Sequence, residues 1–135
     1  MTETRGDLVL VLEDQAETRA WLASVASMVF PGVTVIEAAN LAQASAWLDS
    51  GDDAVARLRL AIIDLGLPDG SGIGFIRELT RRRPSAVAVV ATIHDDDVNL
   101  LGAIAAGAAG YLLKDQEDGA LAAQLRRIEI GRAHV

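Results

Sequence analysis

The stretch LAIIDLGLPDGSG, residues 60–72, decides how this chain folds. Its apolar start, residues 60–63, is typical of a short strand that is buried on both faces of a sheet. Asp64 ends the apolar run, and the three glycines and one proline that follow within this stretch are typical of a turn-rich loop. We therefore expect a buried strand with a carboxylate at its carboxyl end.

Two other apolar runs end in a charged residue in the same way. The run LVLVL is followed by Glu13 and Asp14, and the later run AGYLL is followed by Lys114. The carboxyl ends of parallel strands share one edge of a sheet, and ligands bind in the crevice there. We therefore expect these three side chains and Asp64 to surround one pocket.

The order of the expected elements predicts the fold class. Apolar and β-branched runs alternate with segments of helical pattern, and Asn40 is a suitable N-cap for the second helix. The expected strands are 8–12, 33–36, 60–63, 86–91 and 109–113, and the expected helices are 16–30, 40–48, 73–83, 96–106 and 116–130. Residues 50–59 have no clear pattern, and Gly131 is the expected end of the last helix. Five strand–helix units in one chain predict an α/β fold, a doubly wound parallel sheet with helices on both faces.

The residue types at the strand ends point to metal and phosphate chemistry. Carboxylates that lie close together repel unless a cation or proton joins them, and a few carboxylates with water suit Mg²⁺. Thr92 follows the fourth strand, so a hydroxyl and the ammonium of Lys114 would face the acidic group, as phosphoryl transfer requires. Each residue also has an ordinary explanation: Asp64 as a turn cap, Thr92 as a helix N-cap, Lys114 as an exposed strand-end charge. Their placement along one edge of one sheet favours a site.

Composition excludes several classes of protein. A formal net charge of −7 over 135 residues argues against nucleic-acid binding by this chain, and zero cysteines exclude disulfides and thiol chemistry. The one basic cluster, residues 81–83, is explained by cations at the negative end of a helix. The longest apolar stretch, residues 104–113, is too short to span a bilayer, and residues 1–7 show no signal-peptide pattern. We expect a cytoplasmic protein that does not contact a membrane.

The four strand-end segments together resemble a known family. VLVLED, IIDLGLPDGSG, VVAT and GAAGYLLKD are similar to the receiver (REC) domain of bacterial two-component response regulators, and the likeness covers residues 7–131. It implies a single receiver domain with short tails at 1–6 and 132–135. It also implies a flavodoxin-like (βα)5 fold with strand order 2-1-3-4-5. The motif LLKD is most similar to the one found in regulators with a LuxR/NarL-type helix-turn-helix output domain. We therefore expect either a single-domain regulator or part of a longer DNA-binding one.

The resemblance also implies roles for the residues of the site. Asp64 would be the phosphoacceptor that forms an aspartyl phosphate. Asp14 would bind Mg²⁺ (with Mn²⁺ as an acceptable substitute), Glu13 would bind it directly or through water, and Gly66 would add its backbone carbonyl. Lys114 would pair with Asp64 and then with the phosphoryl oxygens. Two departures from the family pattern are Glu13, where many relatives have Asp, and Asp115, where most have Pro.

A switch and its partners follow from the same resemblance. Thr92 would move toward the phosphoryl group and Tyr111 would turn inward, changing the surface around the fourth helix, fifth strand and fifth helix. The implied donor is a histidine kinase or phosphotransfer protein. The implied outcome is control of an output such as transcription, with homodimerisation on phosphorylation allowed for. The chain would be a signalling domain that assists its own phosphotransfer and dephosphorylation, not an enzyme with a separate substrate.

Two other functions remain open from the residues. A haloacid-dehalogenase-like phosphatase also uses a strand-end Asp and Mg²⁺, but it requires a second Asp where this chain has Gly66. A receiver-fold interaction module that works without phosphorylation would not need the acidic residues, Thr92 and Lys114. The presence of all of them in this chain argues against that function.

Overall fold

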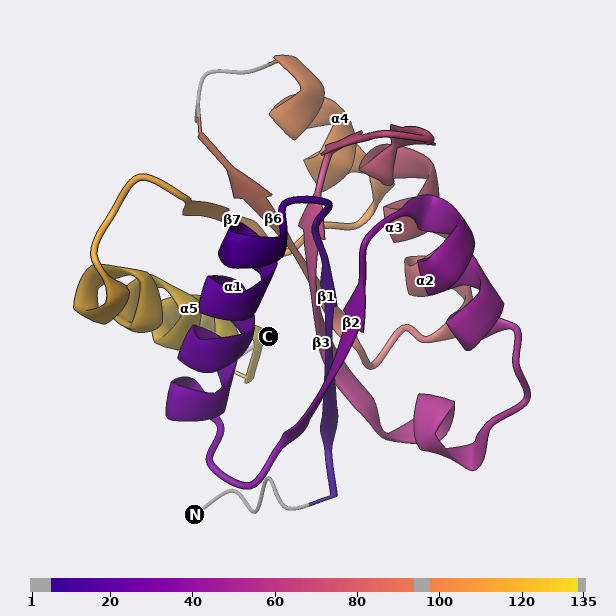
Figure 1. Ribbon diagram of the computed structural model, residues 1–135, viewed down its shortest axis with the longest axis horizontal. Coiled ribbons are helices and arrows are strands. Elements are labelled where there is room, and N and C mark those ends of the chain that lie inside the picture. Colours follow the sequence, from indigo (N-terminus) through magenta and orange to yellow (C-terminus); the bar gives the residue numbers. More distant parts are fainter. Residues whose placement is uncertain (1–5, 94–97, 134–135) are drawn as a thin grey trace.

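A computed structural model describes residues 6–93 and 98–133 of the chain. Its centre is a parallel sheet in the order β2-β1-β3-β6-β7, which confirms the expected order 2-1-3-4-5 (Figure 1). The strands are β1 (Leu8–Leu12), β2 (Thr34–Ala38), β3 (Leu58–Asp64), β6 (Val87–Thr92) and β7 (Gly110–Leu113). The two-stranded sheet of β4 (Gly66–Leu67) and β5 (Gly70–Ser71) is a small hairpin directly after β3.

Helices cover both faces of the main sheet (Figure 1). They are α1 (Ala16–Val29), α2 (Leu41–Leu48), α3 (Gly72–Arg82), α4 (Val98–Ala106) and α5 (Asp118–Ala133), with a 3-10 helix, η1, at Asp53–Arg57. The core on one face joins the sheet to α1 and α5, and the core on the other joins it to α2, α3 and α4. No helix among the described residues combines the length and apolarity that crossing a bilayer requires.

The central strands are apolar because both of their faces are covered. In β1 the leucines pack on the α2, α3 and α4 side, while Val9 and Val11 pack on the α1 and α5 side. Residues Ala61 and Ile63 of β3 face the first core, and Leu60 and Ile62 face the second. This alternation, together with full burial of β1, anchors the residues that follow the strands.

Three local features differ from the sequence-based expectation. The region 50–59, which has no clear pattern in the sequence, contains η1, which begins where the Asp52 side chain accepts a hydrogen bond from the backbone N–H of Ala54. The loop after Asp64 pairs with itself as β4 and β5. The predicted end of the last helix at Gly131 is wrong, because α5 continues to Ala133; one glycine weakens a helix by only about 1 kcal/mol. The start of the helix expected from residue 96 lies outside the described residues.

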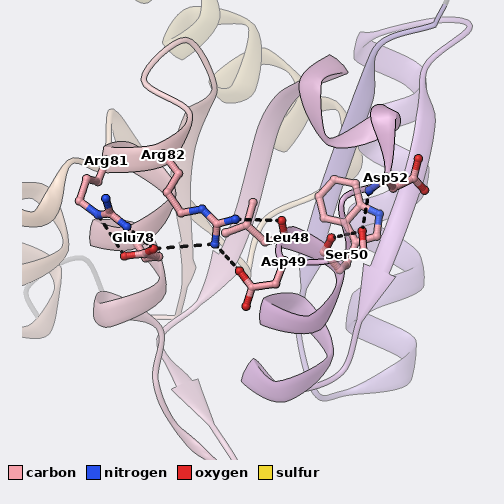
Figure 2. Close-up of polar contacts among 8 residues, drawn as sticks. Leu48, Asp49, Ser50, Asp52, Glu78, Arg81 and Arg82 are labelled. Carbon is pink, nitrogen blue, oxygen red and sulfur yellow. Dashed lines mark hydrogen bonds and ion pairs between the residues drawn. The ribbon is translucent and has the colours of Figure 1, made fainter.

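The carboxyl end of helix α2 is bonded to the carboxyl end of α3, as Figure 2 shows. The guanidinium of Arg82 donates to the carbonyl of Leu48 at 3.2 Å and forms an ion pair with Asp49. Both Arg81 and Arg82 also pair with Glu78 of their own helix, at 2.6 Å and 3.8 Å. Arg81 and Arg82 lie in the last turn of α3, where cations are favourable, and Arg82 also satisfies the end of the neighbouring helix.

Candidate functional site

The acidic residues converge because β1 and β3 are neighbours in register. Leu12 of β1 pairs with Ile63 of β3, so the next residues, Glu13 and Asp64, lie beside each other at the same edge. Oxygens of Glu13, Asp14 and Asp64 lie within 4.8 Å of one another. The predicted gathering of three carboxylates is therefore present.

Glu13 is the most deeply buried of the three. Its side chain has 0% exposure, and its Oε2 accepts a hydrogen bond from the backbone N–H of Gln15 at 3.0 Å. The Glu13 N–H donates to the carbonyl of Ala38 at 3.0 Å, which continues the β1–β2 pairing by one residue. Burial raises the pKa of the Glu13 carboxyl, and the neighbouring Lys114 ammonium opposes that rise.

Lys114 connects two of the carboxylates. Its Nζ lies 2.6 Å from Oε1 of Glu13 and 3.5 Å from Oδ1 of Asp64. The closer contact is an ion pair at the distance of a charge-assisted hydrogen bond. The backbone N–H of Lys114 donates to the carbonyl of Thr92 at 2.8 Å, so pairing of β7 with β6 places the ammonium.

Asp64 is held at the mouth of the loop. Its Oδ1 accepts a hydrogen bond from the N–H of Gly66 at 3.1 Å. Below it, the N–H of Gly72 donates to the carbonyl of Leu65 at 3.1 Å, and a Cβ on Gly72 would lie 2.6 Å from the carbonyl oxygen of Asp64. Glycine is therefore needed at 72 for α3 to begin so close to the phosphoacceptor candidate.

A pocket of about 800 Å³ opens over these residues. It is lined by polar side chains of the strand ends and by residues of α1 and α4; those that the sequence predicted are Glu13, Asp14, Asp64, Gly66, Thr92 and Lys114. Tyr111 is not among the lining residues. It pairs with Val90 of β6, two residues before Thr92, so Tyr111 and Thr92 lie on the same face of the sheet.

Residues that the sequence analysis did not single out also build the site. Arg19 of α1 donates through its guanidinium to the carbonyl of Glu13 at 2.9 Å and pairs with Glu37 at 3.2 Å, which holds the acidic loop from its backbone. Trp21 lines the pocket and donates through Nε1 to Asp118 of α5 at 2.6 Å. The Arg19–Glu37 and Trp21–Asp118 contacts have no spacing signal in the chain, because each one links elements that the fold brings together.

The donor set fits a hard divalent cation. Three carboxylates share one pocket with a single ammonium, so this group of four side chains is net negative. Mg²⁺ prefers a few carboxylate oxygens with the remaining positions left to water and phosphate, and an open pocket provides that room. Glu13, Asp14 and Asp64 are the residues that could hold the ion.

Comparison with known proteins agrees with this geometry. Residues 9–126 match the family described as response regulator receiver domain. The chain is 32% identical over 126 residues to the DNA-binding transcriptional activator DevR/DosR of Mycobacterium tuberculosis, covering 93% of this chain and 55% of that protein. It is 37% identical over 119 residues to the KDP operon transcriptional regulatory protein KdpE of Escherichia coli, covering 87% of this chain and 49% of that protein.

Solved structures show the same fold. A two-component response regulator of the LuxR family from Aurantimonas superposes with a TM-score of 0.74 at 24% identity, covering 92% of this chain and 85% of that one. The chain spans about half the length of the curated relatives named above. The family match over most of the sequence, together with these relatives, shows that the chain belongs to the response regulator receiver domain family.

Proposed function

We propose that Asp64 accepts a phosphoryl group from a phosphohistidine of a partner histidine kinase or phosphotransfer protein. The family supports this role, since its members act as signalling phosphoacceptors and not as classical enzymes. The observation that carries the proposal is the convergence of Asp64 with Glu13, Asp14 and Lys114 in one pocket. We further propose that the receiver unit spans residues 7–131, with short tails on either side.

The proposed transfer is a displacement at phosphorus. A carboxylate oxygen of Asp64 attacks the phosphorus and the P–N bond of the phosphohistidine breaks. The electron pair of that bond stays on the histidine nitrogen, which takes a proton from water. Within the described residues both polar contacts of the Asp64 side chain involve Oδ1, so we assign the attack to Oδ2.

Mg²⁺ would be held by Glu13, Asp14, Asp64 and the carbonyl of Gly66, and Mn²⁺ would serve in its place. When bound, the ion supplies positive charge against the equatorial oxygens of the phosphoryl group. The ammonium of Lys114, already 3.5 Å from Asp64, would pair with one of those oxygens. The hydroxyl of Thr92, which lines the pocket, would donate to another.

Thr92 and Tyr111 would carry the signal away from the site. Both lie on the sheet face that α4 covers, and the strands that hold them, β6 and β7, are paired directly. Movement of Thr92 toward the phosphoryl group would change the packing around Tyr111 and so the surface formed by α4, β7 and α5. We propose that this surface controls an output in the cytoplasm, through transcription or through homodimerisation on phosphorylation.

Intact-mass spectrometry after incubation with acetyl phosphate and Mg²⁺ tests the assignment. Wild type should gain one phosphoryl group, roughly 80 Da, and Asp64→Asn should gain none. Asp49→Asn is the matched control, because it removes an exposed carboxylate at the far end of α2. A chelator should stop the gain. Equal labelling of Asp64→Asn and wild type would overturn the role of Asp64, and no gain in any sample would favour a phosphorylation-independent interaction module.

A further inference from the structure

The turn that follows Asp64 is bonded to the start of helix α2. Oδ1 of Asp69 accepts a hydrogen bond from the N–H of Leu41 at 2.9 Å, and its Oδ2 accepts one from Ala42 at 3.0 Å. These are the first two amides of α2, which have no acceptor within their own helix. The side chain of Asn40 separately caps the N–H of Gln43 at 2.8 Å. Helix α2 is therefore capped by its own chain neighbour and by a residue 28 positions away from Leu41.

Asp69 lies at the tip of the β4–β5 hairpin. Gly66 pairs with Ser71 and Leu67 pairs with Gly70, so only Pro68 and Asp69 remain for the turn. A Cβ on Gly70 would lie 3.0 Å from the Leu41 side chain, so the tip also packs against α2. Only two pairs of residues form this hairpin, so a displacement of its tip would also displace Gly66, which lies at its base opposite Ser71.

The opposite end of α2 is bonded to the same stretch of chain. Arg82, at the end of α3, donates to the Leu48 carbonyl and pairs with Asp49 (Figure 2). An anion thus sits at the positive end of α2 and a cation at its negative end, and both come from the segment 69–82. Helix α2 is in this way a fixed support for the hairpin.

We propose that Asp69 is a positioning residue for the divalent cation. By tying the hairpin tip to α2, it sets where the Gly66 carbonyl and the Asp64 side chain lie, and so sets the affinity of the site. This inference rests on the proposed role of Gly66 as a ligand. Coupling between two sites is reciprocal, so a bound cation also strengthens the bonds from the amides of Leu41 and Ala42 to Asp69.

The test is Mn²⁺ binding to the full chain, measured by electron paramagnetic resonance of the free ion, in four proteins. These are wild type, Asp69→Ala, Asp69→Asn and the matched control Asn40→Ala, which weakens the same helix end without touching the hairpin. We expect the Kd of Asp69→Ala to rise on the order of tenfold, as for other residues that orient metal ligands. Asp69→Asn keeps one acceptor oxygen, so its Kd for Mn²⁺ should rise less. The Kd of Asn40→Ala should stay within about twofold of the wild-type value.

Amide hydrogen exchange by NMR with Mg²⁺ gives a second readout. Adding Mg²⁺ to wild type should slow exchange at Leu41 and Ala42, and this protection should be absent in Asp69→Ala. An unchanged Mn²⁺ affinity in Asp69→Ala would overturn the proposal. An equal loss of Mn²⁺ affinity in Asn40→Ala would also overturn it, because loss of a helix cap alone would then explain the effect. If Asp69→Ala does not fold, Asp69→Asn carries the same comparison. Failure of wild type to bind Mn²⁺ would instead refute the metal site itself, and with it the positioning role of Asp69.

Discussion

Replacing Lys114 with methionine should destabilise the protein through Glu13. Methionine keeps much of the volume and removes the charge that lies 2.6 Å from a carboxylate with no exposed surface. Breaking a fully buried ion pair costs about 3–5 kcal/mol. Here the pocket opens beside the pair and the Lys114 side chain is 14% exposed, so water partly solvates the freed carboxylate. We therefore expect a loss of about 2 kcal/mol in the free energy of unfolding.

A double-mutant cycle identifies Glu13 as the cause of that loss. Glu13→Gln removes one of the three clustered negative charges and leaves Lys114 beside Asp64, so it should change stability by less than about 1 kcal/mol. In the double variant the unpaired buried charge no longer exists, and the total cost should fall short of the sum of the single costs by about 1–2 kcal/mol.

The assay is urea unfolding with a chelator present, followed by tryptophan fluorescence, with equal m-values required for comparison. Lys114→Arg is one control, because it keeps the positive charge, and Arg126→Met on the exposed face of α5 is another, because it removes a cation elsewhere. Mg²⁺ in place of the chelator should narrow the difference in unfolding free energy between Lys114→Met and wild type. Without the ammonium the carboxylates bind the cation more tightly, so the variant gains more stability from it. Costs that add to within about 0.5 kcal/mol would refute the reasoning.

Three further predictions concern the frame of the site. Gly72→Ala should lower the free energy of unfolding by about 1–3 kcal/mol, measured by urea titration, because its Cβ would lie 2.6 Å from the Asp64 carbonyl oxygen and backbone must shift. Leu79→Ala, at a position with no exposed surface in α3, should cost about 2–5 kcal/mol by calorimetry; a cost under about 1 kcal/mol would contradict the packing described. The hydrogen bond from the Leu41 amide, followed by that from Ala42, lowers the pKa of Asp69 from its ordinary 3.8. The unfolded chain then binds more protons near that pH, so the difference in urea midpoint between wild type and Asp69→Ala should be present at neutral pH and shrink below about pH 4. A midpoint difference that does not change with pH would contradict this.

Some parts of the site were open to prediction because they depend on local sequence. Asp64 stands where an apolar run meets a glycine- and proline-rich loop, and that signal needs only a few residues on either side. Asn40 was predicted as the N-cap of α2 on the same grounds, and its side chain accepts the Gln43 amide. The acidic pair after β1 was placed at the same edge because strand-end position follows from the βα order.

Other parts required the three-dimensional arrangement. The sequence predicted Lys114 near Asp64, yet its closest partner is Glu13, since the order β1-β3-β6-β7 and the buried position of Glu13 decide which carboxylate the ammonium reaches. Asp69 lies in the turn-rich loop that the sequence predicted, but its bonds to α2 depend on how two segments far apart in the chain are packed.

The amino-acid sequence by itself determined the βα alternation, the edge of the sheet at which the polar residues gather, and the family to which the chain belongs. These depend on periodicity and strand-end position, which are properties of short segments. Tertiary structure alone decided the charge pairing of Lys114 with Glu13, the clamping of α2 by Asp69 and Arg82, and the support of the acidic loop by Arg19. Hydrogen bonds and ion pairs act over a few ångströms, so they are set by which elements become neighbours, and no local pattern encodes that distance.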